Sequence, residues 1–353
     1  MQYTQQDFKS DQEVRWCPGC GDHAILASVV RAMPQVCEEL GLTKEQFVFV
    51  SGIGCSSRFP YYMNTYGFHG IHGRAAALAT GIKVANPKLS VWQMTGDGDS
   101  LAIGGNHFIH EIRRNIDLNI ILFNNRIYGL TKGQYSPTSK LGIVTKTSPY
   151  GSVEQPFNPG SLVLGARGTF FARSLDSELA LNQKIMVRAA QHKGASVMEM
   201  LVNCVIFNNG THAEISDRDV RAERTIVLED GKPMIFGKDR DKGLVMDGHK
   251  LKVVKIGENG ITENDILVHN SHEDNLGLQN MLVDMKYPEY PVALGVIRDV
   301  EGKTYETSVH EQVADVTAKS KFHCMKDILH SGATWEVKYY RKSILTPKYI
   351  YLF

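Results

Sequence analysis

Two short polar motifs of the chain contain the residue types that hold a divalent cation next to a phosphate group. Asp97 lies in the run Thr-Gly-Asp-Gly-Asp at 95–99, and Asn125 is the second of a pair of asparagines farther along the chain. Mg2+ prefers octahedral oxygen ligands and usually binds through one or two carboxylates together with phosphate oxygens. Asp97 could supply a carboxylate, Asn125 an amide oxygen and Ile127 a backbone carbonyl. Either motif alone also fits a plain turn after a strand, whereas the two together predict a site for Mg2+ and a diphosphate.

Four of the six cysteines stand where they could bind a metal. Cys17 and Cys20 form a Cys-x-x-Cys pair, while Cys55 and Cys204 each follow an expected strand. Four thiolates are the ligands of a 4Fe–4S cluster. They equally suit a structural zinc ion, so the thiolate count alone leaves both metals open.

Other common catalytic motifs are absent from the sequence. There is no His-Glu-x-x-His zinc motif, no Gly-x-Ser-x-Gly elbow and no Gly-Lys-Ser/Thr phosphate loop. The run at 95–99 is not a dinucleotide fingerprint, because Leu101 occupies the third glycine position. Cys37 and Cys324 lack spaced partners, and we expect both to be ordinary buried thiols. For His107 and His110 we expect structural packing or capping.

The composition describes a globular protein with a substantial core. Hydrophobic residues make up 42% of the chain and charged residues 22%, and the formal net charge is +1. This balance gives no electrostatic footprint for nucleic acid or for an acidic membrane surface. The N-terminus is polar, and no uncharged run approaches the roughly 20 residues of a membrane helix. We therefore expect a cytoplasmic protein with reduced cysteines, since six are too few for a disulfide scaffold.

The elements that position these residues follow from hydrophobic periodicity. Cys55, Asp97 and Asn125 each come soon after an apolar run that reads as a strand. Strands that alternate with helices form parallel sheets, and the ligands of such sheets lie beyond the carboxyl ends of the strands. We therefore expect the three side chains to meet at one edge of a doubly wound parallel α/β sheet. The expected strands are 47–50, 91–95, 119–123 and 196–202, and the expected helices are 25–36, with Pro34 as a kink or early stop, 73–84, 101–112 and 179–191.

The chain is expected to have three parts. Residues 1–22 form an N-terminal arm with the Cys-x-x-Cys pair, and 23–210 form the catalytic domain. Residues 211–353 form a small C-terminal extension, rich in hairpins because glycines stand at turn positions between charged stretches. Within the catalytic domain, 131–170 is rich in Gly, Pro, Ser and Thr, which predicts a long ordered loop over the site. The basic and aromatic tail at 338–353 has no assigned role.

Several motifs, in one order, resemble the β subunit of the 2-oxoacid:ferredoxin oxidoreductases, and more specifically its 2-oxoglutarate type. The resemblance covers about residues 14–207 and fades beyond them. It rests on Cys17-Pro-Gly-Cys20, Ile53-Gly-Cys-Ser56, His72-Gly-Arg-Ala75, the Gly-Asp-Gly-Asp run, Tyr128-Gly-Leu-Thr-Lys-Gly-Gln134 and Ser136-Pro-Thr138.

The resemblance implies a cofactor and a metal cluster. The cofactor is thiamine diphosphate with Mg2+ on Asp97, Asn125 and Ile127, and the cluster is one 4Fe–4S on Cys17, Cys20, Cys55 and Cys204. It also places Lys132 near the substrate, although a solvated loop lysine is the plainer interpretation. The residues implied to surround the cofactor are Ile53, Gly54, Cys55, Ser56, His72, Gly73, Arg74, Ala75, Gly98, Asp99, Gly129 and Leu130.

The resemblance further implies a reaction and partners. A 2-oxoacid, with 2-oxoglutarate as the best candidate and pyruvate or a branched acid as alternatives, reacts with coenzyme A and oxidised ferredoxin. The products are acyl-CoA, carbon dioxide and reduced ferredoxin. A separate α (or fused αγ) subunit supplies the other half of the cofactor site. Two other classes remain open on the residues alone: a non-oxidative thiamine-diphosphate lyase, which leaves the cysteines idle, and a zinc-stabilised binding module, which leaves Asp97 and Asn125 idle.

Overall fold

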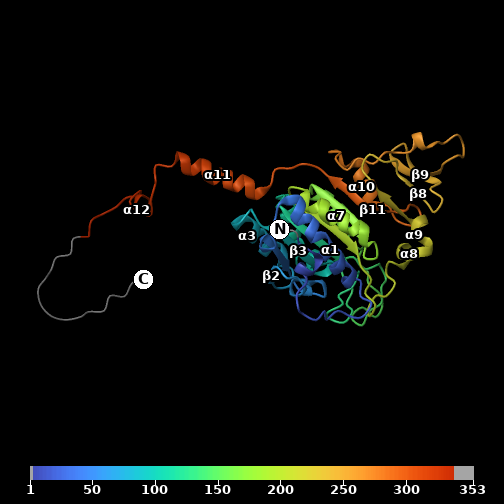
Figure 1. The fold of residues 1–353 in the computed structure, drawn as a ribbon, viewed down its shortest axis with the longest axis horizontal. Helices are drawn as coiled ribbons and strands as arrows, with labels where there is room; N and C mark the ends of the chain where they lie inside the picture. Colours follow the sequence, from blue (N-terminus) through green and yellow to red (C-terminus); the bar gives the residue numbers. More distant parts are fainter. Residues whose placement is uncertain (1–2, 338–353) are drawn as a thin grey trace, which may run out of the picture. The chain divides into compact units, whose positions relative to one another are not determined.

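The computed structural model describes residues 3–337, and within them eight strands form one sheet in the order β2-β1-β3-β4-β6-β5-β11-β7 (Figure 1). All neighbouring strands are parallel except β5 and β11, which are antiparallel. The fold is therefore the predicted doubly wound α/β sheet. Its strands are β1 (Phe47–Ser51), β2 (Tyr66–His69), β3 (Ser90–Gly96), β4 (Leu118–Asn124), β5 (Phe170–Leu175), β6 (Ala195–Leu201), β7 (Thr225–Leu228) and β11 (Val292–Asp299).

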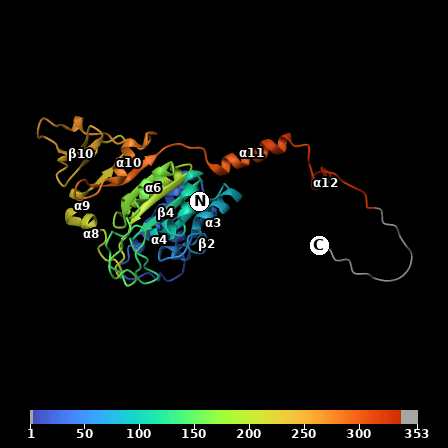
Figure 2. The same ribbon diagram turned by 180° about the vertical axis from the view of Figure 1, so that it is seen from behind.

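Helices cover both faces of this sheet, because alternate strand residues point to opposite sides. Phe47 and Phe49 belong to the core beneath α1 (Asp22–Leu40) and α7 (Leu179–Gln191), which face the viewer in Figure 1. Val48 and Val50 belong to the core on the other face, seen from behind in Figure 2. The helices of that second face are α3 (Ala75–Ala85), α5 (Gly105–Arg113), α6 (Pro159–Gly165) and α10 (Leu276–Asp284).

The helix expected from residue 25 continues through Pro34, so the early stop was wrong. It ends six residues later at Leu40, where Gly41 adopts the left-handed conformation with φ 64° and caps it. A proline inside a helix costs about 3 kcal/mol. Ile25, Val29 and Met33 are all fully buried on one face of α1, and their burial outweighs that cost.

Other helix and loop expectations need local correction. The helix expected at 101–112 is two helices, α4 (Asp97–Leu101) and α5, with a turn between them. The segment 131–170, expected to be one long loop, contains the helix α6, and its last residue is the first residue of β5. The loop itself therefore ends before α6. Cys37 is buried as expected, whereas Cys324 is exposed, so its interpretation as a buried thiol was wrong.

The C-terminal part of the chain, from residue 211, contributes strands to the main sheet and also forms a small sheet of its own. Strands β7 and β11 join the main sheet, and three short strands form a separate antiparallel sheet, β10-β9-β8. The chain divides into one compact unit up to residue 308 and a second from residue 309. The tail at 338–353 lies outside the described residues. The remaining elements are α8 (Ala213–Ser216), α9 (Arg218–Arg224), β8 (Ile235–Phe236), β9 (Lys242–Asp247), β10 (Lys250–Lys255), α11 (Tyr305–Lys319) and α12 (Met325–Leu329).

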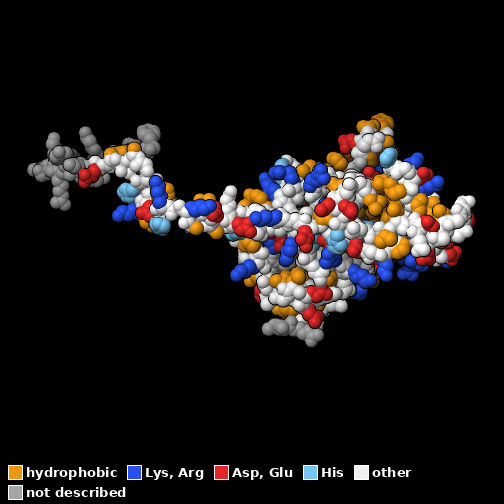
Figure 3. Space-filling view, turned by 90° about the horizontal axis from the view of Figure 1, so that it is seen from above, with side chains coloured by type: hydrophobic (Ala, Val, Ile, Leu, Met, Phe, Trp, Pro, Cys, Tyr) orange, Lys and Arg blue, Asp and Glu red, His pale blue; other side chains and the backbone are white. Residues whose placement is uncertain are grey.

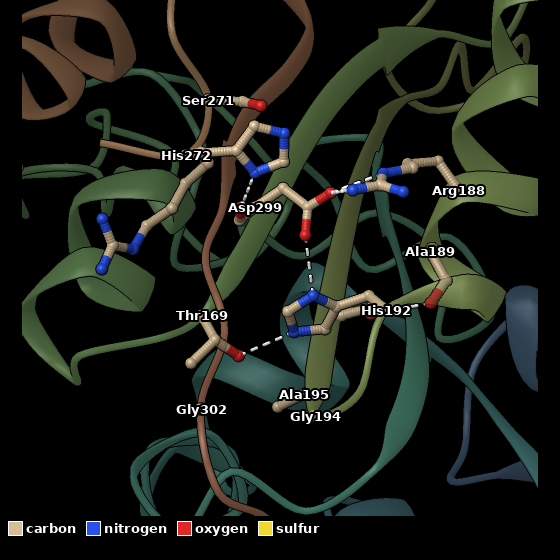
Figure 4. Close-up of polar contacts among 12 residues, drawn as sticks. Thr169, Arg188, Ala189, His192, Gly194, Ala195, Ser271, His272, Asp299 and Gly302 are labelled. Atoms are coloured by element: carbon tan, nitrogen blue, oxygen red, sulfur yellow. Dashed lines mark hydrogen bonds and ion pairs between the residues drawn. The ribbon is translucent and has the colours of Figure 1, made fainter. Parts of the chain in front are cut away.

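A buried polar network ties the edge of the sheet that holds the amino ends of β5 and β6 (Figure 4). His192, just after α7, contacts the Asp299 carboxylate at 2.8 Å through Nδ1 and the Thr169 hydroxyl at 2.9 Å through Nε2. Arg188 forms an ion pair with the same carboxylate. The three segments that meet here are the ends of α7 and β11 and the start of β5, so the network is a structural tie opposite the edge described next.

Among the described residues, no helix is long and apolar enough to cross a membrane. On the face shown in Figure 3, lysine and arginine side chains are interspersed with aspartate and glutamate side chains. That face therefore presents no extended field of one sign.

Candidate active site

A cavity of about 400 Å³ lies at the carboxyl edge of β1, β3 and β4. Its size is that of a site for a small organic molecule. The loops after these three strands bring together the side chains that the sequence predicted to meet. The predicted residues that line the cavity are Ile53, Gly54, Cys55, Ser56, His72, Asp97, Gly98, Asp99, Asn125, Ile127, Gly129 and Leu130.

Asp97 is a buried carboxylate at the start of α4, with 2% of its surface exposed. One of its oxygens accepts hydrogen bonds from the Ser136 hydroxyl at 2.6 Å and the Thr138 hydroxyl at 2.5 Å. Burial raises the pKa of Asp97, and these hydroxyls oppose that rise. Within residues 3–337 no basic side chain forms an ion pair with it. A bound cation would supply the missing positive charge, so the residue fits the Mg2+ site.

Asn125 and Ile127 lie in the loop after β4, where a tight turn presents both to the cavity. The Asn125 side-chain oxygen accepts a hydrogen bond of 3.1 Å from the Ile127 amide. Arg126 between them has φ 56°, a left-handed conformation that few non-glycine residues adopt. The turn therefore places the Asn125 side chain and Ile127 at the cavity that Asp97 also lines.

Asp99 fastens two loops of the cavity to each other. One of its oxygens accepts hydrogen bonds from the Ile53 amide at 3.1 Å and the Gly73 amide at 2.7 Å, and it lies 2.7 Å from His72 Nδ1. The other oxygen accepts from the Thr95 hydroxyl at 3.0 Å. Asp99 therefore positions the loops around the cavity as well as lining it.

Glycine at position 98 allows the Tyr128 ring to pack directly against the start of α4. A Cβ atom there would lie 2.3 Å from the Tyr128 ring, whose hydroxyl donates to the Gly98 carbonyl at 2.9 Å. That distance is sterically forbidden, so the ring and the α4 turn can pack this closely only around glycine.

The four predicted cluster cysteines lie near one another, and Cys55 among them lines the cavity. A Cβ atom on Gly129 would lie 3.3 Å from the Cys55 sulfur and 3.7 Å from the Cys204 sulfur. Cys20 and Cys17 are close enough to interact electrostatically with the Cys55 thiol. Burial, followed by nearby Asp22, raises the pKa of Cys55 to about 12.

The cysteines do not have the arrangement of a single-ion site. Within the described residues, no group of three or more His, Cys, Asp or Glu side chains is placed to hold one metal ion. Zinc draws its sulfur ligands to about 2.3 Å from a single centre. A cluster of four irons and four sulfides separates its four thiolates more widely. The metal that the four thiols would bind stays a prediction.

The N-terminal arm reaches the cavity loop through Trp16. Its indole nitrogen donates a hydrogen bond of 2.7 Å to the Cys55 carbonyl, and the ring packs edge-on against Tyr62. Trp16 is 7% exposed, so the arm is anchored by burial next to Cys17. This contact holds the Cys-x-x-Cys pair beside the loop that bears Cys55.

Some predicted residues lie outside the cavity lining. Gly73 and Arg74 precede α3, and Ala75 is its first residue, so this motif approaches the cavity through the Gly73 amide. Lys132 is exposed, with φ 76°, whereas Thr131 and Gln134 on either side of it line the cavity. Its assignment to the substrate stays a prediction.

Sequence reasoning missed Asp22, which lines the cavity with 1% of its surface exposed. Burial, with Asp176 nearby, raises the pKa of Asp22 to about 7. One of its oxygens has no hydrogen-bond partner among residues 3–337. Its place directly after Cys20 and Gly21 was a signal that could have drawn attention to it.

The cavity region matches a known family of domains. Residues 52–200 match the family described as "Thiamine pyrophosphate enzyme, C-terminal TPP binding domain". This range includes Asp97, Asn125 and Cys55. It ends before Cys204.

Relatives and solved structures extend the match over most of the chain. The chain is 48% identical to the 2-oxoglutarate oxidoreductase subunit KorB of Mycobacterium tuberculosis over 94% of its own length and 88% of the relative. It is 45% identical to the 2-oxoglutarate synthase subunit KorB of Archaeoglobus fulgidus, over 58% of this chain and 73% of that one. Its fold matches the 2-oxoglutarate:ferredoxin oxidoreductase of Magnetococcus marinus, solved with 2-oxoglutarate, coenzyme A and succinyl-CoA bound. There the TM-score is 0.74 at 30% identity, covering 94% and 97% of the two chains.

These matches agree with the resemblance drawn from the sequence motifs. The first relative alone covers nearly the whole chain at an identity that leaves no doubt of common descent. The chain belongs to the KorB family, the thiamine-diphosphate-dependent subunits of 2-oxoacid:ferredoxin oxidoreductases.

Proposed function

We propose that the chain is the β subunit of a 2-oxoglutarate:ferredoxin oxidoreductase. It would take part in the oxidative decarboxylation of 2-oxoglutarate with coenzyme A to succinyl-CoA, carbon dioxide and reduced ferredoxin. One observation carries the proposal: the cavity that holds the buried, unpaired Asp97 is bordered by Cys55, with Cys204 beside it. With these assignments, a decarboxylation site and an electron acceptor would be adjacent. The names of the relatives support 2-oxoglutarate as the substrate.

The cavity residues have the chemistry to bind the cofactor as its Mg2+ complex. Asp97 would offer a carboxylate oxygen, Asn125 its amide oxygen and Ile127 its backbone carbonyl, and the diphosphate would add further oxygens. When bound, thiamine diphosphate supplies the carbanion chemistry that 2-oxoacid decarboxylation requires. The chain's own contribution is placement: Asp99 and Gly98 fix the loops around the cofactor, and the buried surroundings strengthen the electrostatic contacts.

Cys17, Cys20, Cys55 and Cys204 would bind one 4Fe–4S cluster. Cys55 lines the cavity and is also a proposed cluster ligand, so one loop would join the reacting end of the cofactor to the electron acceptor. Burial disfavours free thiolates here, as the raised pKa of Cys55 shows, and binding to iron would offset that cost. A reducing compartment would keep these thiols available, which favours the cytoplasm.

The cavity needs a second subunit for completion, an α (or fused αγ) chain. Leu130, a large apolar side chain that lines the cavity, is 46% exposed. Exposed apolar residues at the mouth of a site are typical of a surface that a partner covers. Ferredoxin, coenzyme A and the 2-oxoacid would be the remaining partners, with no membrane or nucleic acid involved.

Two measurements on the enzyme co-purified anaerobically with its α partner test the proposal. The first is composition: we expect iron, labile sulfide and a broad absorption band near roughly 400 nm. The second is turnover: ferredoxin reduction should require both 2-oxoglutarate and coenzyme A. Tightly bound zinc without iron would indicate the binding-module alternative. Decarboxylation without any electron acceptor would indicate the non-oxidative lyase.

A further inference from the structure

A second cavity of about 330 Å³ lies beside the first along the same edge of the sheet. Asn124 at the end of β4 and Leu201 at the end of β6 line it, as do Arg173 on β5 and Glu199 on β6. Beyond the carboxyl ends of parallel strands is where α/β sheets bind their ligands. None of the roles proposed above uses this cavity.

Arg126 is directed to the second cavity by the backbone of the cofactor loop. Asn125 and Ile127 line the first cavity, whereas Arg126 between them lines the second. The left-handed φ of 56° is what turns this one residue away from its neighbours. A strained conformation at an arginine is retained only where the surroundings enforce it, and such positions cluster at functional sites.

The guanidinium of Arg126 forms no close ion pair within residues 3–337, although the charges of Glu199, Asp97 and Glu214 act on it from farther away. Its one side-chain hydrogen bond runs to the Thr211 carbonyl, at 3.4 Å. Burial lowers the pKa of Arg126, and the nearby charge of Glu199 opposes that change; a guanidinium stays protonated in proteins. A half-buried arginine with most of its donors unused is poised to bind an oxyanion, because its planar fork matches carboxylate and phosphate groups.

The other charges of the cavity leave an excess of positive charge. The charge of Arg173 is neutralised by Glu199, whose Oε2 lies 2.7 Å from Arg173 Nε. The other guanidinium nitrogens of Arg173 donate to the Val283 carbonyl and to the side-chain oxygen of Asn158. Lys140 lies 3.7 Å from Glu214. Lys286 forms no ion pair within the described part of the chain, and it is exposed at the cavity wall.

Histidine adds no charge to this balance. His212 is 4% exposed, and its Nε2 donates a hydrogen bond of 2.9 Å to the Asn124 carbonyl. Burial, and next the charge of Arg126, lower the pKa of His212 to about 3. Arg126 and Lys286 therefore remain, in the described part of the chain, as the two cations of the cavity lining that form no close ion pair.

We propose that this second cavity binds a small oxyanion, a carboxylate or phosphate, held by Arg126 with Lys286 at the rim. The site would also be coupled to the cofactor loop. The Arg126 carbonyl accepts from Ser139 at 2.6 Å, and Ser139 lies in the segment whose Ser136 and Thr138 hydrogen-bond Asp97. The coupling, unlike the binding, rests on the proposed function, since it acts through the assigned cation loop.

Binding is tested by calorimetry on the co-purified complex, saturated with thiamine diphosphate and Mg2+ so that phosphate cannot enter the diphosphate site. The probes are inorganic phosphate and succinate, which tell the two oxyanion classes apart. We expect saturable binding of at least one. A charge-assisted hydrogen bond is worth a factor of about ten to a hundred in affinity. Arg126→Gln should therefore weaken binding at least tenfold, and Lys286→Gln more mildly.

Lys184→Gln is the matched control, because it removes one positive charge from an exposed position of α7 away from the cavity. It should leave probe affinity unchanged. If Arg126→Gln does not fold, the exposed Lys286→Gln variant decides. The proposal is overturned if neither probe binds saturably to the wild type, or if both cavity variants bind as well as Lys184→Gln.

Coupling has a separate readout. When two sites are coupled, each ligand changes the affinity of the other by the same factor. A saturating oxyanion must therefore change the cofactor affinity by the factor by which saturating cofactor changes the oxyanion affinity. We expect an equal, measurable shift in the wild type and none in Arg126→Gln. Oxyanion binding without any shift would refute the coupling and leave the binding site standing, which distinguishes the two claims.

Discussion

The Asp99 carboxylate accepts a hydrogen bond of 2.7 Å from the Gly73 amide, and this contact joins the turn after β3 to the loop before α3. The same oxygen also holds the Ile53 amide at 3.1 Å. A Cβ atom on Gly52 would lie 2.1 Å from the carboxylate, so the loops close around it without space to spare. Asp99 is therefore a positioning residue for three segments of the cofactor cavity.

Replacing Asp99 by Asn should destabilise the protein. An amide has one oxygen where the carboxylate has two, and its NH2 group would face either the backbone amides or the Thr95 hydroxyl. Losing buried hydrogen bonds to a charged group costs about 1.5–3 kcal/mol. We expect a lower unfolding temperature and weaker cofactor binding. The control is Asp239→Asn, at an exposed aspartate. Equal unfolding temperatures for the two variants would contradict the role given to Asp99.

The cluster assignment predicts the effect of single cysteine substitutions. Replacing Cys17, Cys20, Cys55 or Cys204 by Ser should lower the iron content and abolish ferredoxin reduction, because oxygen is a poorer ligand than thiolate for this iron. The measurements are iron and labile-sulfide analysis and the visible spectrum of anaerobically purified protein.

Two cysteines of the same chain serve as controls for that series. Cys37→Ser tests a buried thiol, and Cys324→Ser tests an exposed one. Both should retain wild-type iron content, although the buried substitution is expected to cost some stability. Iron loss in either control that matched the four predicted ligands would show that the series reports misfolding instead of ligation.

Asp97→Ala should sharply weaken the binding of thiamine diphosphate. The substitution removes the only side-chain carboxylate assigned to Mg2+, so the charge of the diphosphate would be poorly neutralised. Excess metal should restore part of the affinity. Ser136→Ala, which removes a hydrogen bond to the same carboxylate, should have a milder effect. Calorimetry on the co-purified complex measures both, and an unchanged affinity in Asp97→Ala would refute the metal site.

The central strands and their ends were predictable from the sequence because they combine two strong signals. Apolar runs such as 119–123 are long enough to identify a buried strand, and polar residues such as Asp97 and Asn125 end them abruptly. The expected helix at 179–191 coincides with α7. Parallel connectivity then places the strand ends at one edge, which is why the cavity lining was largely foreseen.

The remaining features depend on contacts that are distant in the sequence. Strand β11 pairs with β5 and β7 although more than a hundred residues separate it from β5. The exposed edge strand β2 has no buried face to reveal it. Asp22 was missed because its burial depends on the loops that fold over it. Arg126 lines the second cavity and not the first because of its positive φ angle, which residue types alone do not indicate.

His212 predicts a measurable loss of stability as the pH falls. Its pKa is lowered by burial and then by Arg126 to about 3, whereas an unfolded histidine has a pKa of about 6.5. Between these values the unfolded chain binds a proton that the folded chain excludes, so stability decreases with decreasing pH, by up to about 1.4 kcal/mol per pH unit. His212→Gln should remove this part of the slope. Unfolding curves at about pH 7.5, 6.5 and 5.5 test it, and parallel slopes for both proteins would contradict it.

Lys132 offers a test of substrate choice. Its side chain is exposed and makes no ion pair or hydrogen bond within residues 3–337, while Thr131 and Gln134 beside it line the cofactor cavity. A fixed cation close to the departing carboxylate of a 2-oxoacid would hinder decarboxylation. A cation farther out, such as the exposed Lys132 next to residues of the cavity lining, would instead favour a substrate with a second, distal carboxylate. This reasoning supports 2-oxoglutarate over pyruvate.

Lys132→Met should therefore lower kcat/KM for 2-oxoglutarate and leave that for pyruvate unchanged or higher. The charge-assisted hydrogen bond that it removes is worth about 1.5–3 kcal/mol, or about ten- to a hundredfold in kcat/KM. Both ratios must be measured with the same ferredoxin, so that electron transfer affects them equally. Lys146→Met, at an exposed lysine of the same loop that lines neither cavity, controls for the loss of charge. Equal losses for both substrates in Lys132→Met would mean that the lysine supports the loop or the cofactor and does not recognise the distal carboxylate.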